Sequence, residues 1–537
     1  LNSFNVKDDG STIDYNPADI KEYATTTKGI NVDGDSYTAP VQVPLLTHTQ
    51  RLYYNSAVDI ADDGNLHYDA GDSNVHGVKW NELKYAVKLD IIVKAIQRPV
   101  SDGGYGITFS DDFFDTSNTA WDNLYLWLHR TKGIATNGGQ VASTTIPVIG
   151  WADASTTFTG MTNNELYVFN SEQDTVILRF TPATSETYSI TVFRDNVSIL
   201  TSGDRTGVVT YTMPSTTDFS SLYTVQITSS VAITFSSVIW TISNPNIATA
   251  TYNNTSFVKT NVFQLIITQQ IPKMKVLDFL TSIFKMFNLV AYIENDIIVV
   301  KKLDEFYTGG GSYDITKYLD VSKSQSNAAL PFREINFTYT GLGTLLAEQH
   351  NQIDNSEWGK IEYSQDATLE FSGDIYDYKI PFEHMKFERL LDLTDDSSTD
   401  IMWGFCVDDN QESYIGEPLI FYLDSRAANM SFVDSVDGNN VADNNVQITN
   451  YFTPCNSNMN VSTFADQPSL NFMAEADEWE GETNNNTLFN DFHSKFITSV
   501  FDKSNRITRV TAYLPLNVLL NYTLADRFVI IDKSYKI

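Results

Sequence analysis

The chain has 537 residues, with 35 lysines and arginines against 67 aspartates and glutamates, which gives a formal net charge of −32. Because affinity for nucleic acid comes largely from lysine and arginine, this balance argues against nucleic-acid binding as the main task. The length predicts several domains. The 42% hydrophobic residues, with 28 tyrosines and 32 phenylalanines, predict β-rich domains with substantial cores.

Cys406 and Cys455 are the two cysteines of the chain. A secreted protein stabilised by disulfides normally has more cysteines for its length, so we expect both thiols to be free and buried. No apolar run approaches the ~20 residues that span a bilayer, and we therefore expect no membrane segment.

Two helices are predicted in the N-terminal region, residues 1–140. Trp80–Gln97 has apolar residues at helical spacing and is ended by Pro99, and Asn118–His129 is a shorter aromatic helix. Ser110 is a candidate N-cap for the DDFF run that follows it. We expect the apolar faces to lie in a core or a subunit interface, with a sugar-stacking platform as the alternative for the aromatic stripe. These faces contain Trp80, Leu83, Val87, Ile91, Trp121, Leu124, Tyr125 and Leu128.

Residues 147–250 differ in composition from the rest. They are rich in threonine, serine and valine and consist of short alternating runs, among them ELYVF, TVILRF, YSITVF and YTVQIT, separated by turn residues. This pattern predicts a β-sandwich or jelly roll, inserted into a larger α+β body. Such a module either binds glycans or decorates a particle, and the sequence leaves both open.

The central region, residues 251–400, contains the most informative run, Pro272–Lys302. Its first half predicts a helix that starts near Pro272, and its second half predicts two short strands around the polar turn Glu294-Asn295-Asp296. Further along, Tyr376–Leu391 begins as a strand and then turns helical. The apolar face of the first helix, also expected in a core or an interface, contains Val276, Leu280, Ile283 and Phe287.

The C-terminal region, residues 401–537, is predicted to be β-rich, with strands in WGFCVDD, EPLIFYLD, RITRVTAYL and RFVIIDK. One aromatic helix is expected over Leu488–Phe501. The whole chain is therefore predicted to be an α+β, β-rich multidomain protein. Its regions are 1–140, 147–250, 251–400 and 401–537.

Two acidic loops raise the question of calcium. In Asp59–Asp72, an EF-hand aligned on Gly64 has alanine at its third and twelfth positions, which carry ligands in that motif. Asp434–Asn445 has no bidentate glutamate at a fixed spacing. We expect ordinary turns in both places and predict no metal.

No catalytic motif stands out in the chain. The seven histidines form no HExxH and no Cys/His cluster, and there is no GxSxG and no P-loop. Gly341–Leu346 has half of a dinucleotide fingerprint without its third glycine. We predict a protein that is not an enzyme and has no cofactor. A glycosidase would need two carboxylates, for which the first candidates are Glu357 beside Trp358 and the acids of 477–482. Their alternative interpretation is a solvated acidic loop next to a buried indole.

Three segments resemble the hub proteins of tailed-bacteriophage tails and baseplates, of the kind found in phages of Bacteroidetes hosts. They are the helix–hairpin run Pro272–Lys302, the run Trp80–His129, and Leu488–Ile537. The resemblance implies hub-like β-domains with a few short helices, in a structural virion protein of the phage tail.

The resemblance also implies partners. Hub proteins form homotrimers that continue the tail tube around the DNA exit channel and contact the tube, the distal-tail adaptor and the tape measure. Some of the excess carboxylates would then line a lumen that DNA crosses during DNA ejection without binding. On composition alone, an acidic surface that keeps the protein soluble explains the charge equally well.

Two other functions remain open at this stage. The first is another tail component, either a distal-tail adaptor or a receptor-binding protein that uses the predicted sandwich to bind a host surface glycan. The second is a secreted glycan-binding protein or glycoside hydrolase.

Overall fold

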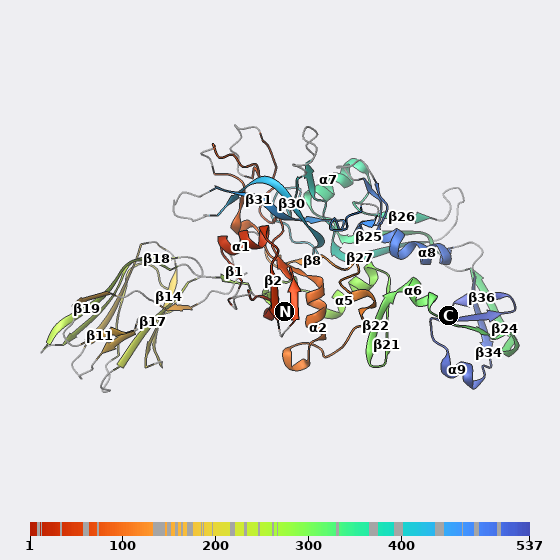
Figure 1. Ribbon diagram of the computed structural model, residues 1–537, viewed down its shortest axis with the longest axis horizontal. Coiled ribbons are helices and arrows are strands. Elements are labelled where there is room, and N and C mark those ends of the chain that lie inside the picture. The colour runs from red at the N-terminus through yellow and green to blue at the C-terminus, as the bar shows by residue number, and fades with distance from the viewer. Residues whose placement is uncertain are drawn as a thin grey trace. The chain divides into compact units, whose positions relative to one another are not determined.

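The computed structural model describes most of the chain as a β-rich α+β fold, as predicted (Figure 1). The residues outside this description are 8–10, 12, 33–34, 57–63, 72–74, 133–144, 148–151, 156–158, 163–164, 169–174, 184, 186, 196, 215–220, 230–232, 245–246, 260–262, 266, 329–331, 365–373, 391–400, 435–444, 464–465, 477–482, 502–505 and 537. The chain divides into two compact units. Unit 1 comprises Leu1–Ser11, Pro17–Ala135 and Ile267–Ile537, and unit 2 comprises Thr12–Asn16 and Thr136–Ile266.

Unit 2 contains the predicted sandwich. One sheet has the strand order β10-β19-β18-β13-β16 and the other has the order β11-β12-β17-β14-β15, with β9 also paired to β17. The strands are β9 Thr145–Pro147, β10 Ala152–Ser155, β11 Thr159–Thr162, β12 Glu165–Val168, β13 Thr175–Pro182, β14 Tyr188–Arg194, β15 Val197–Thr201, β16 Val209–Thr212, β17 Ser221–Ser229, β18 Ile233–Asn244 and β19 Ile247–Lys259. A short ribbon of β1 (Asp14–Tyr15) and β20 (Phe263–Gln264) also belongs to this unit.

The core of the sandwich comes from alternate residues of both sheets. Leu178 and Trp240 from one sheet and Ile190 and Val225 from the other belong to one buried hydrophobic cluster. Because every second residue of these strands enters the core, the alternation in the sequence was a reliable signal here.

The main sheet of unit 1 joins segments far apart in the sequence. Its order is β31-β30-β8-β7-β4, and β6 also pairs with β30. The strands are β4 Val41–Gln42, β6 Val78–Lys79, β7 Ala86–Lys88, β8 Leu124–Trp127, β30 Ile420–Val433 and β31 Asn445–Cys455. Regions 1–140 and 401–537, separated by several hundred residues, therefore share one sheet.

Further elements of unit 1 lie outside the main sheet. The helical segments are a 3-10 turn Asn2–Phe4, α1 Pro17–Thr25, α2 Leu89–Gln97, α3 Asp111–Phe114, α4 Ile267–Gln270, α6 Leu303–Thr308 and α7 Leu345–Asp354. The strands are β2 Gly29–Val32, β3 Asp35–Thr38, β5 Leu46–Thr47, β25 Phe332–Gly341, β26 Ile361–Ser364, β27 Asp374–Glu383, β28 Glu388–Leu390, β29 Ile401–Phe405, β32 Glu475–Ala476 and β33 Thr483–Asn484.

The helix–hairpin run is confirmed. It consists of α5 (Val276–Met286), β21 (Leu289–Glu294) and β22 (Ile297–Lys302). Asn295 and Asp296 both have positive φ, +51° and +63°, as a two-residue hairpin turn of the I′ type requires. Pro272 lies four residues before the helix and does not start it.

One predicted helix is wrong, and another is right only in its second half. Trp80–Gln97 begins as a 3-10 turn (Trp80–Glu82), continues as strand β7 and is helical only in α2. Asn118–His129 is a turn followed by strand β8. Both strands lie inside the sheet, and all four residues of β8 are buried, so no alternation marks it as a strand.

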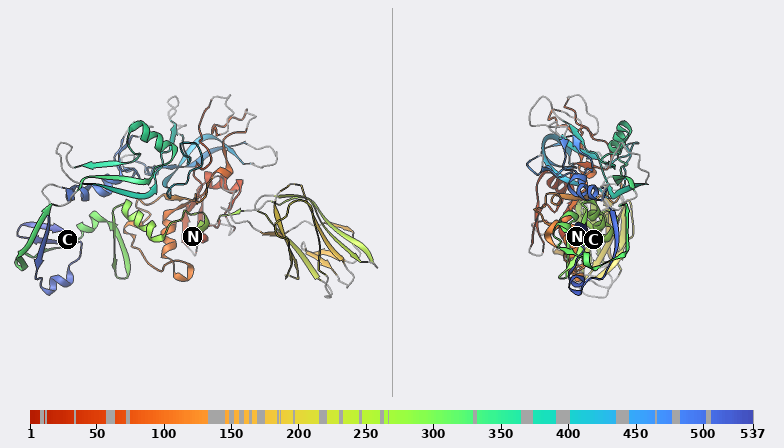
Figure 2. Two further views of the ribbon diagram at one scale, coloured as in Figure 1. Left: turned by 180° about the vertical axis from the view of Figure 1, so that it is seen from behind. Right: turned by 90° about the vertical axis from the view of Figure 1, so that its right-hand side faces the viewer.

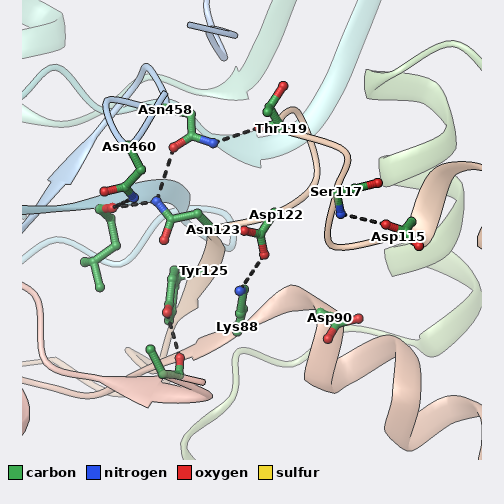
Figure 3. Close-up of polar contacts among 12 residues, drawn as sticks. Lys88, Asp90, Asp115, Ser117, Thr119, Asp122, Asn123, Tyr125, Asn458 and Asn460 are labelled. Carbon is green, nitrogen blue, oxygen red and sulfur yellow. Dashed lines mark hydrogen bonds and ion pairs between the residues drawn. The ribbon is translucent and has the colours of Figure 1, made fainter. Parts of the chain in front are cut away.

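Polar contacts hold the turn before β8 (Figure 3). Asn123, at φ +66°, donates to the Leu423 carbonyl at 2.6 Å, and Asn458 donates to the Thr119 carbonyl at 2.8 Å. Lys88 forms an ion pair with Asp122 at 2.5 Å. These contacts fix residues 119–123 to neighbouring strands in a conformation that a helix does not allow.

Smaller predictions also need correction. Tyr376–Leu391 has no helix, because β27 is followed by the short strand β28. Ser110 precedes α3, but its hydroxyl accepts a hydrogen bond from the Val300 amide at 3.1 Å and makes no capping bond.

The aromatic helix over Leu488–Phe501 is confirmed, as a π turn (Phe489–His493) followed by α8 (Ser494–Phe501).

A small module, which we call the terminal module, is formed by residues 312–328 and 506–536. Its elements are β23 Ser312–Asp314, a 3-10 turn Thr316–Tyr318, β24 Leu319–Ala328, β34 Arg506–Ala512, α9 Leu516–Asn521, β35 Arg527–Ile530 and β36 Lys533–Lys536. β24 pairs with β34, and β35 lies between β23 and β36, so the green and blue strands lie side by side in Figures 1 and 2.

Candidate functional site

The terminal module exposes a group of large apolar side chains. Tyr513 and four leucines are each at least 52% exposed, and we call this group the leucine surface. Its members are Tyr513, Leu516, Leu519, Leu520 and Leu524. In α9 only Val518 is buried, so this helix directs most of its apolar residues away from its own unit.

The loop after α9, which carries Leu524, is fixed by Asp526. Its carboxylate accepts hydrogen bonds from the Thr523 amide at 2.6 Å and from the Gly311 amide at 2.5 Å. These bonds hold the pKa of Asp526 below its ordinary value. A Cβ on Gly310 would lie 1.9 Å from the Ala525 carbonyl oxygen, so the two backbone segments are in direct contact. These contacts fix the backbone on both sides of Leu524 beside residues 310–311.

The terminal module also differs from the rest of the chain in charge. It has seven lysines and arginines against four aspartates, whereas the whole chain has 35 against 67. The seven cations are Lys317, Lys323, Arg506, Arg509, Arg527, Lys533 and Lys536. The apolar surface therefore lies on a net basic module, although the chain as a whole is strongly acidic.

The residues that the sequence singled out lie elsewhere, in the interior of unit 1. Trp80 and Val276 are partly buried. The buried ones are Leu83, Val87, Ile91, Trp121, Leu124, Tyr125, Leu128, Leu280, Ile283 and Phe287. Because elements of the same chain cover these side chains, they form core. Trp121 packs on Phe114 at 4.8 Å between ring centroids and offers no exposed face for a sugar.

The surroundings of Glu357, the carboxylate beside Trp358, fit the alternative interpretation of an acidic loop next to a buried indole. The Glu357 carboxylate accepts a hydrogen bond from the Thr338 hydroxyl at 2.9 Å, and the Trp358 ring is buried against His350 and His384. The second candidate, residues 477–482, lies outside the described residues. The loop over 435–444 and residues 57–63 and 72 of the other acidic loop also lie outside them.

Within the described part of the chain, no group of three or more His, Cys, Asp or Glu side chains is arranged to hold a metal ion. Cys406 and Cys455 are free and buried, as predicted. Burial raises the pKa of both thiols. The structure as described also contains no helix of the length and apolarity needed to cross a bilayer.

A buried polar cluster surrounds Lys84, which is fully buried. Its ammonium group donates to His48 Nδ1 and to the Thr131 carbonyl, both at 2.6 Å. His48 Nε2 donates in turn to the Tyr414 carbonyl. Burial lowers the pKa of Lys84 to about 7. Burial and the nearby lysine lower that of His48 to about 2. His48 is therefore neutral, with the tautomer that accepts from Lys84 and donates to Tyr414.

A buried carboxylate, Glu383, lies in the same unit. It accepts hydrogen bonds from the backbone amides of Gly343 and Glu417 at 3.1 and 3.2 Å, and burial raises its pKa to about 7. A Cβ on Gly341 or on Gly416 would lie about 2 Å from its Oε2 atom. The carboxylate is in close contact with backbone, and burial is the main cause of its raised pKa.

An apolar cavity of about 350 Å³ lies between α2 and the start of α5. Its lining includes Ile92, Ile96, Leu126 and Phe279. This volume is at the lower end of the range for small-molecule pockets.

The leucine surface was missed by sequence reasoning, which predicted the strands RITRVTAYL and RFVIIDK on either side of its leucines and no helix between them. The spacing of Leu516, Leu519 and Leu520 matches one face of a helix, a signal present in the sequence. The same spacing also describes a helix face packed in a core, and only the fold shows that no part of the described chain covers it.

Comparison with known protein families and with curated proteins finds no match.

Proposed function

We propose that this protein is a structural subunit of a tailed-phage tail: a tail-tip or baseplate hub that assembles with copies of itself into a ring around the DNA exit channel. The observation that carries the proposal is the leucine surface. Covering large apolar side chains that are exposed to water lowers the free energy, and such patches mark interaction sites. The proposal assigns the chain no catalytic role.

Two further properties support a hub. The strong negative charge would repel DNA, as suits a channel through which DNA passes without binding. The sandwich is a compact unit with its own core, as expected of a module inserted into a hub body. The partners would be further copies of the chain and the tube, adaptor and tape-measure proteins of the tail.

A second candidate function follows from that same sandwich. A separate β-sandwich is also suited to present a glycan-binding face, in which case the protein would be a receptor-binding component of the tail. A glycan array probed with the full chain separates the two functions. A hub with a decorative insert should bind no glycan above background, and saturable binding to one glycan class would favour the receptor-binding function.

Electron microscopy of the purified chain tests the hub proposal. We expect particles of three or six copies around an axial hole. A chain that stays monomeric and releases sugars from a bacterial or algal polysaccharide would overturn the proposal in favour of a glycoside hydrolase.

A further inference from the structure

The partner of the leucine surface can be argued from charge. The surface belongs to a module in which cations outnumber acids, and all seven of these cations are exposed. The module that carries the leucines is therefore net positive. An acidic partner surface would gain both apolar burial and electrostatic attraction.

Two terminal modules are poorly suited to each other. A symmetric contact would place the net positive module of one copy against the same net positive module of the next, which opposes association. The rest of the chain has the opposite character, since it holds all but four of the 67 acids and only 28 of the 35 cations. A second copy of the chain thus offers a complementary surface outside its own terminal module.

We propose that the terminal module of one copy docks, through the leucine surface and its neighbouring cations, on the acidic remainder of a second copy. The contact is head to tail, so each copy uses two different surfaces. Repeated head-to-tail contacts close into a ring when the rotation between copies divides a full turn. The inference rests on the proposed function and names the surface and the partner through which the ring forms.

The central test is a double variant of the full chain, Leu519→Glu with Leu520→Glu. Both side chains are exposed, so the fold should tolerate the change, and the thermal transition checks this. The matched control is Ile353→Glu, which changes an 81% exposed residue on α7, outside the module. Mass photometry over a concentration series should show at least tenfold weaker association for the double variant and unchanged association for the control.

Charge is tested separately with Arg509→Glu and Lys533→Glu. If the partner surface is acidic, these changes should weaken association of the full chain, and the wild-type complex should dissociate progressively as salt rises. The matched control is Lys273→Glu, an exposed lysine outside the module. Association that is insensitive to both salt and charge reversal would overturn the acidic partner.

A mixing experiment tests the geometry. The double variant keeps its acceptor surface. A head-to-tail contact therefore predicts mixed complexes in which a wild-type copy docks on a variant copy. The altered leucine surface of that variant copy then binds no further copy. A module-to-module contact predicts that the variant is excluded from wild-type complexes. Exclusion would overturn the head-to-tail geometry.

The remaining outcomes separate this inference from the proposed function. If the wild type forms rings and the double variant forms them equally well, the docking surface is wrong and the hub function stands. If the wild type is monomeric at every concentration, a second copy does not bind the leucine surface, and the self-assembly that the hub proposal requires fails as well.

Discussion

Lys84 is an unusual residue for a protein interior, since a lysine without a carboxylate partner is seldom fully buried. Its hydrogen bonds go to His48 and to a backbone carbonyl, and both acceptors are neutral. The cluster therefore tolerates Lys84 in either protonation state, but burial disfavours the charged one. This has a measurable consequence for stability.

We predict that Lys84 makes stability rise with pH. Its pKa is about 7 in the folded chain against an ordinary value of 10.5, so between these values the unfolded chain binds the extra proton. The destabilisation is complete below pH 7 and disappears as pH rises toward 10.5. Lys84→Met should remove a slope of up to about 1.4 kcal/mol per pH unit from denaturant-unfolding free energies between pH 7 and 10. The exposed Lys132→Met is the control, and an unchanged slope in Lys84→Met would contradict the prediction.

Glu383 should act in the opposite direction. Its pKa is raised from 4.5 to about 7 in the folded chain, so the folded chain binds the extra proton between these values and stability falls as pH rises through this window. Glu383→Gln keeps an oxygen that can accept from Gly343 and Glu417, and it should abolish this fall in unfolding measurements between pH 4.5 and 7. Glu357→Gln, at an exposed glutamate, should leave the fall in place. Identical profiles for the wild type and Glu383→Gln would contradict the prediction.

At the scale of elements, the sequence was informative where one face of an element meets water. The strands of unit 2 alternate between buried and exposed positions, and α5 with its hairpin shows both a helical stripe and a polar turn. β7 and β8 are instead enclosed by neighbouring strands of one sheet. Their apolar runs have no period that separates strand from helix, and the partner β30 lies some 300 residues away, beyond the reach of local pattern.

The sandwich should behave as a separate cooperative element. Trp240 is buried in its core and packs edge-on against Tyr223 at 5.8 Å between ring centroids. Trp240→Ala should destabilise unit 2 by about 3–5 kcal/mol. In calorimetry of the full chain, the transition of unit 2 should move to lower temperature while that of unit 1 stays in place.

The control for this change is Val197→Ala in the same unit, at a residue that is 65% exposed. It should shift unfolding by no more than about 0.5 kcal/mol. A parallel shift of all transitions in Trp240→Ala would show that the two units unfold as one.

At the scale of the whole molecule, the important property is the uneven distribution of charge and exposed apolar surface. Net charge could be read from composition, but the location of the exposed apolar surface could not. The apolar helix faces expected in a core or a subunit interface lie in the core of unit 1, whereas three residues of the leucine surface, Leu516, Leu519 and Leu520, belong to the short helix α9. A sequence pattern shows which side chains are apolar, whereas burial depends on contacts made across the whole chain.

Sedimentation velocity of the full-length chain over a concentration series tests the central claim of self-assembly most directly. We predict one discrete complex of fixed copy number that gains population at the expense of monomer as concentration rises, and that dissociates as salt rises. A single monomeric species across the whole series would contradict the claim, and the leucine surface would then have to bind something other than a second copy of this chain.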